Sequence, residues 1–275
     1  MLEQLKYVNH QNEVFEFGKN GVYVNQNDLR DFAWTATKRN NRISALNRDV
    51  SNRNLTIIII CATEAEGTAV KNRLHEISEK DVYAMKYGKI VIGDYYFKCF
   101  VTKSQKAQYL INKRYMRVTL TLTTDQPYWI KETTKAFRTA ASSSGTVSGL
   151  DYPHDFPFDY LSATSNDKIN NTGFVASAFK LIVYGECTNP LIYIGDHAYQ
   201  VNCTVDENEY LTIDSVAKQI YLTKNDGTII NEFNQRKKDS YIFEKIPAGM
   251  NAVSWNGSFG FDLTLLEERS EPKWT

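Results

Sequence analysis

The sequence lacks the long apolar segments that place a protein in or across a membrane. Its longest apolar run, Ile57–Ala62, is far too short to span a bilayer. The first ten residues, MLEQLKYVNH, contain no apolar stretch of the kind found in signal peptides. We therefore expect a soluble protein that is made in a cytoplasm and does not insert into membranes.

Paired cysteines are also missing. The four cysteines lie far apart and form no CxxC pair, which disfavours a disulfide framework or a zinc site. We expect them to be buried thiols that pack as small apolar side chains. They are Cys61, Cys99, Cys187 and Cys203.

Catalytic and cofactor motifs are absent as well. The chain has no GxSxG elbow, Walker A loop or GxGxxG fingerprint. Its four histidines show neither HxxH nor HxxxH spacing, and we interpret His75 as a solvated helix residue. The acidic turn Asp206–Glu209 offers oxygen ligands for calcium but lacks the spacing and the glycine of an EF-hand. We therefore predict no catalytic, cofactor-binding or metal-ligating residues, no cofactor and no enzymatic activity.

Blocks of helix-forming residues are scarce, whereas Tyr, Thr, Ile and Val are plentiful, and this balance favours strands. One helix is nevertheless predicted, over about residues 64–79. Thr63 and Glu66 have the spacing of a capping box. Val70, Leu74 and Ile77 then form one apolar stripe, which predicts packing on a sheet.

The strands expected in the first half differ in their patterns. The continuous apolar run Leu55–Ala62 predicts a strand buried on both faces. Lys89–Val101 predicts a hairpin that turns at Gly93-Asp94. Residues 116–123 alternate apolar and polar side chains, which predicts one buried and one solvated face.

After about residue 165, short strands recur roughly every ten residues with turns between them, which is typical of a β-sandwich. Asn225-Asp226-Gly227 is a strong hairpin turn. The predicted strands are Phe179–Tyr184, Tyr199–Val205, Tyr210–Asp214, Gln219–Thr223, Thr228–Asn231, Tyr241–Glu244 and Phe259–Leu266.

These patterns predict a mainly β protein with two domains. The first, residues 1–138, is an α+β domain with one helix packed on a β-sheet, and the second, residues 166–275, is the β-sandwich. Residues 139–165 form a linker of small polar residues followed by an aromatic and proline-rich belt.

Net charge differs between the two halves of the chain. Residues 1–150 have 22 Lys and Arg against 14 Asp and Glu, net +8, and residues 151–275 have 10 against 18, net −8. Opposite charges suit contacts between subunits. The alternative is that the net charge of each half arose independently and has no role in assembly.

Two groups of residues are candidates for contacts. The polar and basic segment Asp28–Arg42 predicts an extended arm or a long hairpin. The basic cluster downstream of Trp34, made of Arg39, Arg42, Arg48 and Arg53, is interrupted by acids and asparagines, which favours contact with another protein over nucleic-acid binding. The subunit-contact candidates in and after this segment are Phe32, Trp34, Arg39, Arg42 and Arg48. Four aromatic residues of the sandwich are candidates for stacking on sugar rings: Tyr193, Tyr241, Trp255 and Phe259.

An ordered set of segments resembles the distal tail protein (Dit) family of long-tailed phages that infect Gram-positive bacteria. In the first half these are NRISALNRDV (41–50), GKIVIGDYYFKCFV (88–101) and LTLTTDQPYWI (120–130), and they are followed by the belt DYPHDFPFDY (151–160). In the second half they are residues 189–214, KQIYLTKNDGTIINEF (218–233), IPAGMNAVSW (246–255) and RSEPKW (269–274). The resemblance covers essentially the whole chain.

The resemblance implies a structural role in the phage virion, at the tail tip or baseplate. The first domain would close into a homo-hexameric ring, and the second would be a galectin-like sandwich outside it. The ring would join the tail tube protein to the tail hub protein and support receptor-binding or baseplate proteins used in host attachment. Its lumen would pass the tape measure protein and DNA without sequence-specific binding.

Alternative functions remain open. One is a stand-alone carbohydrate-binding β-sandwich module, which predicts a monomer that binds glycans. Another is a different ring or hub subunit of the tail, although a tube subunit is usually shorter and has one domain. A hydrolase of cell-wall polymers would need a carboxylate pair or a metal site, and the sequence offers no convincing pattern for either.

Overall fold

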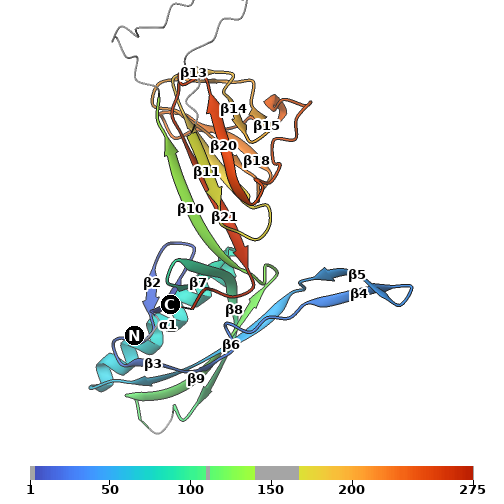
Figure 1. The fold of residues 1–275 in the computed structure, drawn as a ribbon. Coiled ribbons are helices and arrows are strands. Elements are labelled where there is room, and N and C mark those ends of the chain that lie inside the picture. The colour runs from blue at the N-terminus through green and yellow to red at the C-terminus, as the bar shows by residue number, and fades with distance from the viewer. Residues whose placement is uncertain (1–3, 110–111, 140–166, 275) are drawn as a thin grey trace, which may run out of the picture. The chain divides into compact units, whose positions relative to one another are not determined.

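The computed structural model describes residues 4–109, 112–139 and 167–274 (Figure 1). The chain divides into two compact units. Unit 1 contains Met1–Lys131 and the last residues, Glu268–Thr275, and unit 2 contains Glu132–Glu267. The prediction of a mainly β protein is confirmed, because the described residues form antiparallel sheets and a single α-helix.

Unit 1 is built around one long strand, β8 (Tyr95–Ala107). Its first half pairs with β7 (Gly88–Ile92), which continues the sheet through β1 (Leu5–Val8) to β2 (Val14–Glu16). Its second half pairs with β9 (Tyr115–Thr124), from which the sheet continues through β6 (Ser51–Ile60) to β3 (Val22–Asn27). The predicted hairpin and its turn are thus confirmed, with Gly93 at φ 55°.

The apolar run before the helix is less buried than predicted. In β6, Leu55, Ile57 and Ile59 are fully buried, whereas Ile60 is 52 % exposed and Ile58 only half-buried. The prediction of burial on both faces is therefore wrong for the end of this strand. A continuous apolar run does not distinguish a strand buried on both faces from a strand that covers a core with one face. The antiparallel strand β6 is of the second kind at this end.

The single helix, α1 (Glu64–Ala84), begins as predicted. The Thr63 hydroxyl accepts from the Glu66 backbone N–H at 3.2 Å, and the Glu66 carboxylate accepts from the Thr63 N–H at 3.1 Å. Leu74 and Ile77 are buried in the unit 1 core. The helix continues past the predicted end at residue 79, through the buried Asp81, to Ala84, and its C-cap residue Met85 has the left-handed conformation.

Unit 2 contains two sheets that share one core. One sheet has the strand order β19-β18-β17-β12-β21-β10, and the other has the order β11-β20-β14-β15. Leu181 and Leu263 of the first sheet lie in the same apolar cluster as Ile192 and Val253 of the second, which is the arrangement of a β-sandwich. The strands are β10 (Trp129–Phe137), β11 (Asp167–Asn171), β12 (Ala178–Tyr184), β14 (Leu191–Ile194), β15 (His197–Gln200), β17 (Tyr210–Asp214), β18 (Gln219–Thr223), β19 (Ile229–Asn231), β20 (Gly249–Trp255) and β21 (Phe261–Arg269), with a small pair, β13 (Cys187–Thr188) and β16 (Thr204–Val205). The first residues of β10 and the last residues of β21 belong to unit 1.

Two strand predictions in unit 2 are wrong. Residues 241–244 form a turn in which the Glu244 N–H donates to the Tyr241 carbonyl, although Ile242 and Phe243 are buried there. The expected strand Tyr199–Val205 is divided between β15 and β16. In both places buried apolar residues lie on irregular backbone. An apolar sequence pattern does not distinguish such a segment from a buried strand.

The structure divides the chain at positions other than those expected from sequence. The predicted linker, residues 139–165, lies almost entirely outside the described residues. The last residues group with unit 1, where Arg30 donates to the Pro272 carbonyl at 2.7 Å and stacks on Trp274 at 3.7 Å.

The cysteines are free thiols. Cys61, Cys99 and Cys187 are buried as predicted, and Cys203 is half-buried. Burial raises the pKa of Cys187 to about 11, which disfavours the reactive thiolate.

Candidate interaction surfaces

The predicted arm of unit 1 is a β-hairpin, formed by β4 (Thr35–Arg39) and β5 (Arg42–Asn47). Its two-residue turn is Asn40-Asn41, with φ 49° and 60°. Positive φ at both central residues is what a tight turn between twisted strands requires, and Asn is among the few residues that adopt it readily. Figure 1 shows this hairpin extending away from the body of unit 1.

Every residue of both strands is exposed. Ala36 lies opposite Leu46, and Lys38 lies opposite Ile43, with a bulge between the two pairs. Since alternate residues of a strand share a face, these four side chains lie on one side of the hairpin. That side is largely apolar, and Ile43 and Leu46 are 64 % and 54 % exposed.

The other side of the hairpin is polar. The Ser44 hydroxyl donates to the Thr37 carbonyl at 3.0 Å, and Asn47 Nδ2 donates to Thr37 Oγ1 at 3.3 Å. The predicted contact residues Arg39 and Arg42 pair with each other next to the turn, both exposed. The hairpin is therefore amphipathic, with an apolar side that no residue of unit 1 covers in the described structure.

Two of the predicted contact residues meet at the base of this hairpin. The Arg48 guanidinium lies 4.3 Å from the Trp34 ring centroid and 5.7 Å from that of Tyr128, and it donates to the Ser270 hydroxyl at 3.2 Å. Burial lowers the pKa of Arg48, and the nearby Glu268 carboxylate opposes this effect. Phe32 is 52 % exposed.

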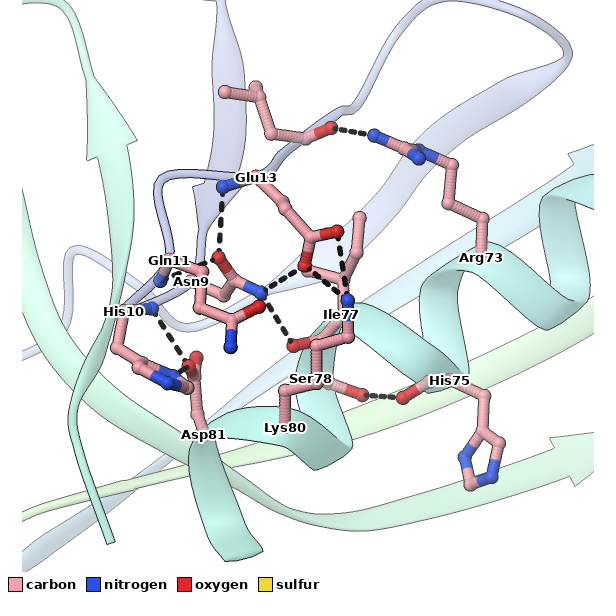
Figure 2. Close-up of polar contacts among 11 residues, drawn as sticks. Asn9, His10, Gln11, Glu13, Arg73, His75, Ile77, Ser78, Lys80 and Asp81 are labelled. Carbon is pink, nitrogen blue, oxygen red and sulfur yellow. Dashed lines mark hydrogen bonds and ion pairs between the residues drawn. The ribbon is translucent and has the colours of Figure 1, made fainter. Parts of the chain in front are cut away.

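A buried polar network joins the end of α1 to the loop after β1 (Figure 2). Asp81 is fully buried and accepts from the His10 N–H at 2.8 Å, with His10 Nδ1 at 2.6 Å. It also accepts from the Tyr7 hydroxyl. Burial, followed by this hydrogen bond, raises the pKa of Tyr7 far above its ordinary value. The sequence carries no signal for Asp81, because nothing in its spacing distinguishes it from a solvated helix residue.

The same network fixes the loop itself. The fully buried Asn9 accepts from the N–H groups of Gln11 and Glu13 at 3.0 and 2.9 Å and donates to the Glu13 carboxylate at 2.6 Å. Lys80 donates to both Glu13 oxygens at 2.8 Å, and this lowers the pKa of Glu13 (Figure 2). Each of these groups already has a partner, which indicates that the network holds the fold rather than a ligand.

The acidic turn of unit 2 contains its own cation. Lys224 Nζ lies 2.8 Å from the Glu209 carboxylate and 3.6 Å from that of Asp206. This lysine takes the place that a calcium ion would need between the two carboxylates. No three His, Cys, Asp or Glu residues of the described ranges are grouped closely enough to bind a metal ion. Among those residues, too, none of the helices has the length and apolarity of a transmembrane span.

The four candidate sugar-stacking residues separate into two pairs. Tyr193 and Tyr241 are 43 % and 56 % exposed. Trp255 and Phe259 are only 4 % and 2 % exposed and lie in the unit 2 core, where Trp255 Nε1 donates to the Phe259 carbonyl at 2.9 Å. Their rings cannot stack on a sugar, so the prediction is wrong for this pair. Its cause is that aromatic type alone does not distinguish core from surface.

Comparison with known proteins found structural neighbours only. No family model matches the sequence, and no curated protein matches it. The chain is similar to the SPP1 Dit protein (gp 19.1), described as a paradigm of the hub adsorption apparatus in phages that infect Gram-positive bacteria. This match has a TM-score of 0.60 and 10 % identity, and it covers 98 % of this chain and all of that one.

Two further similar chains come from the phage P2 baseplate in its activated conformation, one structure with Ca and one with Sr. Each has a TM-score of 0.64 and 12 % identity, and each match covers 99 % of this chain and all of the other. Both units are therefore matched, not one domain alone. The chain has the fold of the phage Dit and baseplate proteins, as its sequence resemblance implied.

Proposed function

We propose that the chain is a structural subunit of a phage tail tip. Six copies close into a ring that joins the tail tube protein to the tail hub protein and supports the receptor-binding components. The lumen passes the tape measure protein and DNA. The fold is the first support for this role, because the neighbours whose descriptions name a hub adsorption apparatus and a baseplate match the chain over almost its whole length.

The observation that carries the proposal is the uncovered apolar side of the β4–β5 hairpin. An isolated two-stranded hairpin is at best marginally stable in water, and it needs a third strand or an apolar surface to pack on. Ile43 and Leu46 offer a surface for such packing. In a closed ring one surface of each subunit contacts a different surface of the next, so a projecting hairpin on one copy suits an interface with its neighbour.

The charge asymmetry also supports assembly. The basic first half and the acidic second half give each subunit two regions of opposite net charge. Regions of opposite charge favour a defined orientation between neighbouring subunits and between the ring and adjoining tail proteins.

The test is the mass of the full chain in solution, measured by light scattering, together with negative-stain images. We expect hexameric rings for the unaltered protein and monomers for Ile43→Asp/Leu46→Asp. The matched control is Tyr83→Asp/Met85→Asp, which changes two residues of unit 1 that are 82 % and 78 % exposed. We expect the control to remain hexameric.

A monomeric unaltered protein that yields no rings would overturn the proposed function. If the hairpin variant remained a hexamer, the ring would stand but the hairpin would not be its interface. Unfolding midpoints of both variants near that of the unaltered protein would show that lost assembly does not reflect lost folding.

A further inference from the structure

Unit 2 has a long groove beside β18 and the segment that follows β19. Two hollows of about 570 and 440 Å³ adjoin there, because Lys218 and Phe233 line both of them. A third hollow, of about 500 Å³, continues the second along Arg236–Lys238. We call this series of three hollows the 218–243 groove. Each hollow has the size of an ordinary ligand site.

Stacked aromatic rings form the middle of the groove. Phe243 is 3 % exposed, and its ring lies parallel to that of Phe233 at 6.0 Å and edge-on to that of Tyr241 at 5.9 Å. Tyr241 is 56 % exposed. The buried ring therefore supports an exposed one, which presents a flat apolar face at the surface.

Cations are placed among these rings. Lys218 Nζ lies 5.2 Å from the ring centroids of both Tyr241 and Phe243. The Arg236 guanidinium lies 4.0 Å from the Phe233 centroid, and Lys237 and Lys238 line the groove beyond it. Among the described residues, none of these four cations forms an ion pair with a carboxylate.

This concentration of positive charge is unusual within its unit. Glu132–Glu267 contains 10 Lys and Arg against 17 Asp and Glu, yet four of those ten cations line the groove. Asp239 is the one acidic residue among the described lining residues. A cationic groove in an acidic body attracts anions locally while the rest of the surface repels them.

The segment that carries the groove is held in place although it forms no strand. The Ser240 hydroxyl donates to the Ala198 carbonyl at 2.6 Å, and His197 Nε2 lies 2.9 Å from the Tyr241 carbonyl. Arg236 donates to the Phe233 carbonyl at 2.6 Å. A site fixed in this way loses little conformational freedom when a ligand binds.

We propose that the 218–243 groove binds a linear anionic glycan, a chain of sugar or polyol units that carry phosphate or carboxylate groups. The apolar face of a sugar ring stacks on Tyr241, and the anionic groups contact Lys218, Lys237 and Lys238. Amides of Gln219 and Asn231, which line the first hollow, are suited to sugar hydroxyls. A neutral glycan would not need the four cations, and an acidic peptide would not need an exposed ring. This inference goes beyond the proposed structural role, because the groove lies within one unit of a single chain.

The test measures binding of the full chain to four polymers by biolayer interferometry. They are glucosylated poly(glycerol phosphate), hyaluronan, neutral dextran and polyglutamate. We expect binding to one or both anionic glycans, with no comparable binding to dextran or polyglutamate. Binding of poly(glycerol phosphate) alone would identify the preferred anion as phosphate, and binding of hyaluronan alone would identify it as carboxylate. Either outcome supports the site.

Charge and ring variants locate the binding. Lys237→Glu/Lys238→Glu should raise Kd at least about tenfold, because hydrogen bonds to charged groups are lost. Tyr241→Ala should also raise Kd, whereas Tyr241→Phe, which keeps the ring, should not. The control Lys168→Glu/Lys245→Glu makes the same charge change at two exposed lysines outside the groove lining and should bind nearly as the unaltered protein does.

Several results would overturn the inference. They are equal binding of dextran or polyglutamate, no binding of any polymer, and a groove variant that binds as well as the control. Thermal unfolding of each variant separates loss of the site from loss of folding. Ring formation is measured separately, so failure of the groove and failure of the proposed ring are distinguishable.

Discussion

The β4–β5 hairpin of unit 1 and the segment 233–243 of unit 2 combine backbone regularity and burial in opposite ways. The hairpin has regular strands and a well-formed turn, but every residue of its strands is exposed. Apart from a short 3-10 turn, η1 (Phe233–Gln235), the segment has no regular structure, yet it buries Ile242 and Phe243 in the core. Regular backbone therefore does not identify the packed parts of this molecule. We propose that the ordered but exposed hairpin is a surface for another copy, and that the irregular segment fixed on the core is a preformed site.

The largest expected effect is a difference in stability between two truncations to alanine, one in the segment 233–243 and one in the hairpin. Phe243→Ala should lower the free energy of unfolding by about 3–5 kcal/mol, because it removes a fully packed ring and leaves a cavity. Ile43→Ala should change the stability of the monomer by no more than about 0.5 kcal/mol, because the side chain is exposed. Urea unfolding of both variants, at concentrations that keep the protein monomeric, measures the difference. Similar losses would show that the hairpin belongs to the core of unit 1.

A smaller effect is expected from the hairpin turn. Asn41→Val places a β-branched residue at positive φ and should destabilise the hairpin by about 1–2 kcal/mol. Since the hairpin has no core, the global unfolding transition should stay unchanged. Amide exchange across residues 36–46 should accelerate, and ring formation should weaken. Asn41→Gly, which tolerates positive φ, is the control, and equal exchange in both variants would contradict this interpretation of the turn.

The smallest effect is expected from one anchor of the unit 2 segment. Ser240→Ala removes the hydrogen bond to the Ala198 carbonyl and should cost about 1 kcal/mol of stability. It should also weaken binding of an anionic glycan, because Tyr241 loses part of its support. Ser258→Ala is the control, since that hydroxyl contacts only Asn256 in an exposed turn. Equal glycan affinity in the two variants would show that the segment needs no such anchoring.

Local chemistry explains which parts of the fold were predictable from sequence. The capping box at Thr63 and the alternation in β9 rest on neighbouring residues, so the sequence contains their whole cause. The burial of Phe259 and the turn at Tyr241–Glu244 depend on which residues pack from distant strands. A pattern of residue types does not contain that information.

The candidate sites show the same division. The sequence of Asp28–Arg42 predicts an arm or a hairpin. It does not predict the apolar side of the hairpin, which depends on the cross-strand pairing of Lys38 with Ile43 and includes residues after Arg42. The groove cations could be read from sequence only as Lys218 and the run Arg236–Lys238, which are separated by 17 residues. Their convergence on Phe233 and Phe243 is a product of tertiary packing.

Electron cryomicroscopy of the assembled full chain tests the central interpretation most directly. We expect a sixfold ring in which Ile43 and Leu46 of each subunit are buried against the next subunit. A ring whose hairpins point into solvent, or a protein that stays monomeric at every concentration, would contradict it.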